Sequence, residues 1–281
     1  MAHPTALPIT RSALPAGAQG TLVSFVPANG ALLIAADSRS TTLGVRCDGR
    51  TKLAIPANPP LTIVAGTGTS EWIFARVPLW EHDPCGDIEK NGQTFLDAKS
   101  LTLKYLESVE QPIWLLDLKG LADHILSAVI NVARQSPDYV RAFAGTTMFQ
   151  VVLGAFDPAT NTSYVRALQF NLTKEMAIDA KITADHKFTN ADKPDYPHFG
   201  DTITFTTHVM LGVGRRHLPK SLEQIHAKAK VGEISVEQAS DLAINLIEAA
   251  KLTAVDVPEL NSIGGNVAAY RIDSGGIKRI R

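Results

Sequence analysis

Three short apolar runs fill much of residues 21–65, and turn-forming residues separate them. They are TLVSFV (21–26), ALLIAA (31–36) and LTIVA (61–65). Apolar runs of this length, bounded by turn signals, predict β-strands rather than helices. Pro27, Ala28, Asn29 and Gly30 supply turn chemistry between the first two runs, so we expect these to form a hairpin.

The rest of the chain alternates between strand-like and helix-like patterns. Strands are predicted at 148–156, 162–170, 174–183, 202–211 and 266–272. Helices are predicted from Thr69 or Ser70 through Trp72, Phe74 and Leu79, and at 96–109, 118–135 and 235–250. Ser235 and Gln238 form a capping box for the last helix. Residues 82–95 and 184–200 are polar, contain turn formers and are predicted as loops.

This order of elements predicts two packed sheets with helices on their outer faces, an α+β domain covering residues 21–281. Residues 1–20 are rich in Ala, Pro and Gly and have no periodicity, so we interpret them as a leader. They have no charged stretch followed by an apolar one, which makes them a poor signal peptide.

The net charge, the cysteines and the histidines limit the kinds of partner and ligand that we expect. The formal net charge of −1 argues against nucleic acid or an anionic membrane as the main partner. Cys47 and Cys85 match no metal-ligand spacing; two free thiols in a reducing compartment are favoured, and one disulfide stays open. The segment 184–200 holds His186 and His198, but their spacing does not support a metal site, and we expect no cofactor.

Four residues along the first 66 suit a protease whose nucleophile is its own first residue. Thr21 follows Gly20, and cleavage between them would give Thr21 a free α-amino group, a base with an ordinary pKa of about 8. Lys52 would disfavour a second positive charge on that amine, and Asp37 would pair with Lys52. Gly66 would donate its N–H to an oxyanion.

Each of these residues also has a structural interpretation. Thr21 could simply open a strand, Asp37 could end one and cap the turn, and Lys52 could lie on the surface. Their occurrence together, in this order, is what favours the catalytic interpretation.

The stretch GTLVSFVPANGALLIAADSRST, followed by Lys52 and the AGTG turn at 65–68, resembles the start of a mature proteasome-type β subunit, an N-terminal-nucleophile (Ntn) hydrolase. Farther along, LGVG at 211–214, Asp256 and SIGG at 262–265 resemble later elements of that family. The length favours a longer bacterial homologue of the betaproteobacterial type over the HslV type, with residues 82–117 as an insertion. The resemblance implies a four-layer αββα sandwich.

The resemblance also implies roles for further residues. Ser40, Thr41, Arg50, Ala54, Val64 and Gly68 match substrate-binding positions, while Asp256 and Ser262 match supporting ones. Arg50 either points into the pocket and favours acidic substrates or faces solvent in the turn at Asp48 and Gly49. Val213 departs from the family pattern, which places a serine there.

The function implied is that of a threonine endopeptidase, activated by self-cleavage and enclosed in stacked homo-oligomeric rings of 12 or 14 subunits in the cytoplasm. Peptides and unfolded proteins would be its substrates, and an ATP-dependent unfoldase is a further candidate partner. Two alternatives stay open: an Ntn amidohydrolase acting on a small amide, and a non-catalytic ring subunit that keeps its leader.

Overall fold

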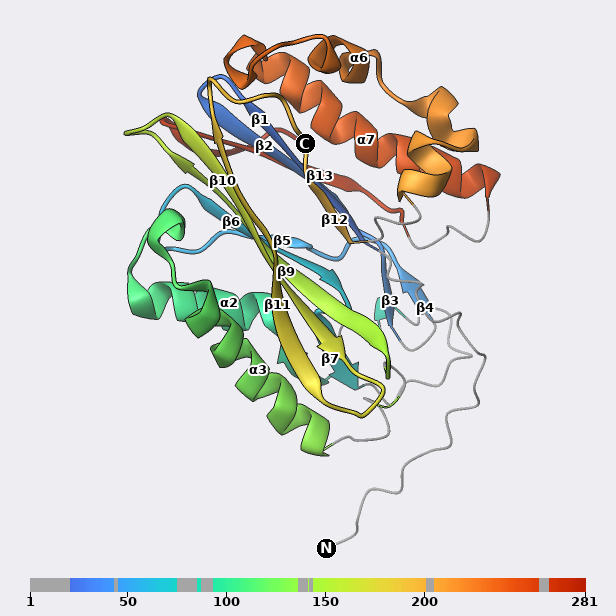
Figure 1. Cartoon of the computed structure of the whole chain (residues 1–281). Coiled ribbons are helices and arrows are strands. Elements are labelled where there is room, and N and C mark those ends of the chain that lie inside the picture. Colours follow the sequence, from blue (N-terminus) through green and yellow to red (C-terminus); the bar gives the residue numbers. More distant parts are fainter. Residues whose placement is uncertain are drawn as a thin grey trace, which may run out of the picture.

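In the computed structural model, two five-stranded antiparallel sheets lie between two layers of helices (Figure 1). The structure describes residues 21–42, 45–74, 85–86, 93–135, 141, 144–200, 205–257 and 263–281. The predicted fold class, a four-layer αββα sandwich, is confirmed by this arrangement. The leader, including Gly20, lies outside the described residues.

The first sheet contains the predicted hairpin and the last strands of the chain. Its order is β12 (His198–Gly200), β1 (Leu22–Ala28), β2 (Ala31–Asp37), β13 (Val267–Asp273) and β14 (Gly276–Arg279). Asn29 and Gly30 form the turn between β1 and β2, and Gly30 has the left-handed φ of 73° that glycine adopts readily. The hairpin prediction is therefore confirmed.

The second sheet is formed largely by long strands from the middle of the chain. Its order is β11 (Ile178–Thr189), β10 (Thr162–Leu172), β9 (Thr146–Asp157), β6 (Thr62–Gly68) and β5 (Leu53–Ala54). Two separate two-stranded antiparallel sheets are formed by β3 (Ser40–Thr42) with β4 (Val45–Cys47) and by β7 (Glu71–Phe74) with β8 (Gln93–Asp97).

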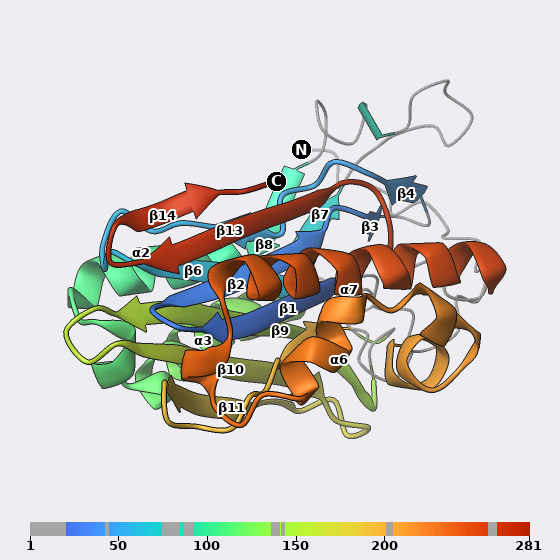
Figure 2. The ribbon, with the colours of Figure 1, turned by 90° about the horizontal axis from the view of Figure 1, so that it is seen from above.

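Helices cover the outer face of each sheet, as the two perpendicular views show (Figures 1 and 2). Helices α7 (Val236–Asp256) and α6 (Lys220–His226) cover the first sheet, and α2 (Ala98–Val109) and α3 (Leu118–Gln135) cover the second. The predicted capping box of Ser235 and Gln238 begins α7. The short helical segments are η1 (Ile113–Leu115), η2 (Phe205–Met210), η3 (Val213–His217) and η4 (Val231–Glu233).

Strand β1 is buried on both faces, which explains why its sequence is apolar apart from the buried Ser24. Leu22 and Val26 pack toward α7, whereas Val23 and Phe25 pack between the sheets. The hydrophobic side chains thus form three buried layers: between the sheets, under α7 and under α2 and α3.

Four secondary-structure predictions are wrong in whole or in part. The end of the predicted loop at 82–95, residues 93–95, belongs to strand β8. Residues 71–74 form strand β7, where a helix was predicted, because β8 provides a pairing partner; Leu79 lies outside the described residues. The predicted loop at 184–200 is largely the end of β11, with β12 beyond it. Residues 205–210 of the predicted strand 202–211 are helical, with Phe205 and Val209 buried on one face.

Part of the predicted insertion at 82–117 packs into the hydrophobic core. Leu96, Ala98, Leu106, Ile113 and Leu116 belong to the buried layer under α2 and α3. These side chains help to close the second sheet against its helices.

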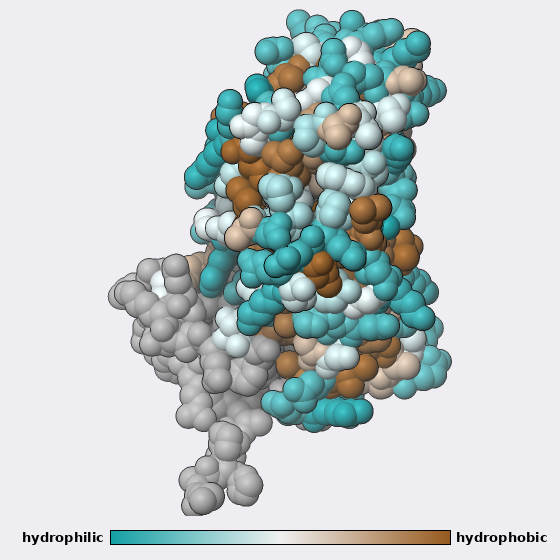
Figure 3. All heavy atoms as spheres, turned by 90° about the vertical axis from the view of Figure 1, so that its left-hand side faces the viewer, coloured by the Kyte–Doolittle hydropathy of each residue, from teal (hydrophilic) through white to brown (hydrophobic). Residues whose placement is uncertain are grey.

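The face shown in Figure 3 carries its hydrophobic side chains in separate groups among hydrophilic ones. Within the described part of the chain, no helix is long and apolar enough to cross a membrane.

Candidate active site

Thr21 lies directly before β1 and is only 1% exposed. Its Oγ1 accepts a hydrogen bond of 2.7 Å from Nζ of Lys52. Lys52 directly precedes β5, so this contact joins an end of the first sheet to an end of the second. The predicted nucleophile and the predicted lysine therefore meet, although they are 31 positions apart in the chain.

Asp37 ends β2 and is buried beside them. Its carboxylate accepts three backbone hydrogen bonds, from Leu22 N–H at 2.9 Å, Gly264 N–H at 3.1 Å and Arg39 N–H at 3.2 Å. These donors hold the carboxylate in place and partly compensate its loss of water.

Burial shifts the pKa values of both Asp37 and Lys52 toward neutral pH. It raises the pKa of Asp37 from 3.8 to about 6, against the opposing effects of Lys52 and the three N–H donors. Burial lowers the pKa of Lys52 from 10.5 to about 8, although the charge of Asp37 raises it. Between these two values both groups are charged, and Lys52 is close to losing its proton.

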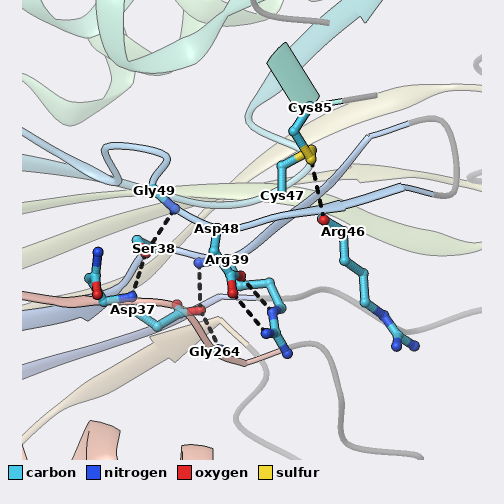
Figure 4. Close-up of polar contacts among 10 residues, drawn as sticks. Asp37, Ser38, Arg39, Arg46, Cys47, Asp48, Gly49, Cys85 and Gly264 are labelled. Atoms are coloured by element: carbon cyan, nitrogen blue, oxygen red, sulfur yellow. Dashed lines mark hydrogen bonds and ion pairs between the residues drawn. A yellow bond between two sulfur atoms is a disulfide. The ribbon is translucent and has the colours of Figure 1, made fainter. Parts of the chain in front are cut away.

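A set of polar contacts around Asp37 links the loops that surround it (Figure 4). Arg39 forms a bidentate ion pair with Asp48, at 2.7 and 2.9 Å. The Ser38 hydroxyl accepts from Gly49 N–H and Asn266 N–H. The carbonyl of Gly264 accepts from the backbone N–H groups of residues 38 and 39. The turn at 263–265 is thereby fixed against the end of β2.

Gly66 lies next to Lys52 but differs from its predicted role. Its N–H donates to the Lys52 carbonyl at 3.1 Å, so the group predicted to bind an oxyanion is already bonded within the protein. This bond fixes the backbone of Lys52. Gly68, at the end of β6, has a left-handed φ of 66°.

Among the predicted substrate-binding residues, Arg50 and Ala54 are half-buried near Lys52. Ser40 and Thr41 lie on β3, and the backbone of Thr41 pairs with Arg46. Val64 differs: it is fully buried in the layer under α2 and α3 and is a core residue here. The backbone N–H of Arg50 donates to the Ser38 carbonyl, which ties the loop before β5 to the end of β2.

The predicted supporting residues do not join the Thr21 group. Asp256 ends α7, where its carboxylate pairs with Arg216 at 2.7 Å and His217 at 2.8 Å on η3. In the described part of the chain it has no bond to Thr21, Asp37 or Lys52. The family resemblance implied a supporting role for Asp256, and its ion pairs at the end of α7 place it with Arg216 and His217 instead. Ser262 lies outside the described residues.

Two residues beside the site were missed. Gly200 has a φ of 103°, and a Cβ there would lie 1.9 Å from the Thr21 carbonyl oxygen. Lys99, on α2, donates to the carbonyl of Thr51, the neighbour of Lys52. Gly200 lies in the segment predicted as a loop, and Lys99 has the pattern of an ordinary surface helix residue, so neither gave a signal.

The two cysteines are bonded to each other, in contrast to the free thiols favoured above. Cys47 on β4 and Cys85 form a disulfide, with their Cα atoms 5.6 Å apart (Figure 4). Their separation of 38 positions in the chain conceals this proximity in the sequence. Cys47 directly precedes Asp48, the ion-pair partner of Arg39, in the chain.

An open cavity of about 560 Å³ lies beside β12 and is lined in part by Tyr196, His198 and Phe199. Burial lowers the pKa of His198. Thr21, Asp37 and Lys52 are not among the lining residues, so this cavity is separate from the Thr21 group.

Comparison with known proteins yields a structural likeness. No family model matches the sequence, and no curated protein matches it. A solved structure, Anbu (ancestral beta-subunit) from Yersinia bercovieri, is similar over 92% of this chain and 86% of that chain, with 13% identity and a TM-score of 0.45. A similarity of this size transfers no residue role or activity to this chain.

Proposed function

We propose that this chain is a threonine endopeptidase of the N-terminal-nucleophile type. It cleaves its own Gly20–Thr21 bond and then uses the exposed Thr21 to hydrolyse peptide bonds in other chains. The observation that carries the proposal is the 2.7 Å hydrogen bond between Lys52 Nζ and the buried Thr21 hydroxyl, next to the buried Asp37.

In the intact chain the nitrogen of Thr21 is an amide and cannot act as a base. Lys52 is the basic group on the Thr21 hydroxyl, and its lowered pKa of about 8 supports a role as the proton acceptor. Thr21 Oγ1 then attacks the Gly20 carbonyl carbon and its proton passes to Lys52. The C–N bond breaks as the nitrogen takes a proton, which leaves an ester that water hydrolyses. The products are a leader ending in a carboxylate and a free amine on Thr21.

After processing, the same hydroxyl attacks the carbonyl carbon of a bound peptide and gives its proton to a base, for which the new α-amino group is available as well as Lys52. The scissile C–N bond breaks as its nitrogen takes that proton, and water hydrolyses the resulting ester and frees Thr21. Asp37 keeps a negative charge beside Lys52 and stabilises the ammonium that forms. Because Gly66 N–H is bonded to Lys52, another donor must bind the oxyanion, or Gly66 must share its hydrogen bond.

The proposal also covers the oligomeric assembly, the substrate, a partner and the cellular location. Stacked rings of 12 or 14 copies would enclose the sites, with unfolded protein as substrate, an ATP-dependent unfoldase as a candidate partner and the cytoplasm as the location. Native mass spectrometry of the processed chain tests the ring size directly.

Intact mass and N-terminal sequencing test the central step. We expect the wild-type chain to lose residues 1–20, Thr21→Ala to keep them, and only the processed protein to hydrolyse fluorogenic peptides. A Thr21→Ala chain that matures to the same terminus without added protease contradicts self-cleavage. A wild-type chain that keeps its leader favours the non-catalytic ring subunit, and hydrolysis of small amides without peptides favours the amidohydrolase.

A further inference from the structure

Lys99 extends from the first turn of α2 toward the peptide that carries Lys52. The start of this helix is firmly fixed. The Asp97 side chain caps it by accepting from Lys99 N–H at 3.0 Å and Ser100 N–H at 3.2 Å. Ala98 N–H donates to the Ser70 carbonyl at 2.8 Å, which ties the helix to the chain that follows β6. The first turn of α2 is therefore a rigid base for the Lys99 side chain.

The stem of Lys99 crosses the backbone of Gly66. A Cβ at Gly66 would lie 2.9 Å from Lys99 Cγ and 2.7 Å from Ser70 Oγ, so a larger residue would displace both side chains. Beyond this crossing, Lys99 Nζ donates to the Thr51 carbonyl at 2.5 Å. Glycine at position 66 thus leaves room for the lysine to reach the segment before β5.

The peptide groups on both sides of Lys52 are held by this pair. Lys99 binds the carbonyl of Thr51, and Gly66 N–H binds the carbonyl of Lys52 itself. With both groups fixed, the Lys52 side chain starts from a defined backbone as it reaches Thr21 Oγ1.

We propose that Lys99 is a positioning residue for Lys52: it anchors the backbone before Lys52 and places a second positive charge beside it. This role rests on the function proposed above, since it concerns the base that activates Thr21.

The charges facing Lys52 come from four elements of the structure. Asp37 on β2 and Glu71 on β7 raise its pKa, whereas Lys99 on α2 and Arg50 in the loop before β5 lower it. Of the two cations, Lys99 has the larger effect. A nearby positive charge disfavours a second one, so Lys99 increases the fraction of Lys52 that can accept a proton.

The titration of Lys52 tests this role without requiring any activity. The full-length Thr21→Ala chain serves as background, and the pH dependence of Lys52 acylation by acetic anhydride is followed by peptide mapping. Lys99→Met should raise the pKa of Lys52 by about half a unit or more. Lys99→Arg should restore it, and Lys104→Met, at an exposed site on the same helix, should leave it unchanged.

Lys99→Gln, which removes the charge but keeps a donor, provides the answer if Lys99→Met fails to fold. An unchanged Lys52 titration in a folded Lys99→Met or Lys99→Gln chain overturns the proposal. In chains that retain Thr21, the pH midpoint of self-cleavage should move upward by the same amount. If no variant self-cleaves but the titration shifts, the positioning role stands and the proposed function fails.

Discussion

At the scale of single residues, folding disfavours the charged forms of two residues in the site, Asp37 and Lys52. The pKa of Asp37 in the folded protein lies above its ordinary value, so protonated Asp37 favours folding. This stabilisation is lost as pH rises from about 4 through about 6. The pKa of Lys52 in the folded protein lies below its ordinary value, so neutral Lys52 favours folding. This stabilisation is lost as pH falls from about 10.5 through about 8. Both groups therefore reduce stability at neutral pH, as expected where an arrangement serves reactivity.

We predict that the rate of self-cleavage rises with pH and levels off above about pH 8. Only about 10% of Lys52 is neutral at pH 7, and the neutral fraction grows roughly tenfold per pH unit below its pKa of about 8. Intact mass measured over time between about pH 6 and pH 9 gives the profile. A rate that is constant over this range contradicts a lysine base.

The matched variants are Lys52→Ala and Lys104→Ala. The first should slow self-cleavage by at least about 100-fold, in line with the loss of a general base. The second changes an exposed lysine on α2 and should leave the rate unchanged. Circular dichroism and the thermal midpoint establish that both variants fold.

At the scale of elements, the edge strand β12 lies against Thr21 at the start of β1. Gly200 pairs with Leu22, and its missing side chain lets β12 approach the Thr21 carbonyl. Its N–H donates to Gln150 Oε1 at 3.2 Å, which also accepts from the Thr67 hydroxyl. Because Gln150 and Thr67 belong to the second sheet, this bond ties the two sheets together near Thr21.

Gly200→Ala should destabilise the protein and slow self-cleavage. The new methyl group would overlap the Thr21 carbonyl, so we expect a loss of about 2–4 kcal/mol in the free energy of unfolding. Urea denaturation and intact mass measure the two effects.

Gly276→Ala is the control, because Gly276 has a similar φ of 114° but open space around it. It should lose about 1–2 kcal/mol from backbone strain alone and keep its self-cleavage rate. Equal losses for the two variants would mean that the contact with Thr21 has no consequence.

At the scale of the whole molecule, the disulfide connects a segment far along the chain to the loops around Asp37. Cys47 precedes Asp48, which pairs with Arg39, and Arg39 N–H reaches Asp37 (Figure 4). Disulfides persist mainly in oxidising compartments, so this bond bears on the cytoplasmic location, which stays a proposal.

Removal of the disulfide should lower stability. A cross-link over 38 residues is worth up to about 4 kcal/mol through the entropy of the unfolded chain. Cys47→Ser and Cys85→Ser should lower the urea midpoint equally, and a reductant should lower the wild type to the same value. A wild-type midpoint that does not respond to the reductant, with free thiols counted, contradicts a bonded pair.

Local patterns predicted the elements that carry a clear apolar run, turn or cap of their own, including β13, although its partner β2 is distant in sequence. The hairpin of β1 and β2, the helix α7 with its capping box and the strand β13 were all predicted. The predictions failed where a distant partner decides. Residues 71–74 become a strand because β8 pairs with them, and β12 forms because the edge of β1 is open to it.

The sequence by itself determined the choice of Thr21, Asp37 and Lys52 as a group, because apolar strands end beside these residues and their chemistry is complementary. Only the tertiary structure decided what surrounds the group: the Gly264 N–H on Asp37 from 227 residues away, the Lys99 side chain over Gly66, and the placement of Asp256 with Arg216 and His217. The physical reason is that a strand or turn is encoded by neighbours within a few residues. The bonding of a buried carboxylate or ammonium depends on whichever distant backbone the packed layers bring to it.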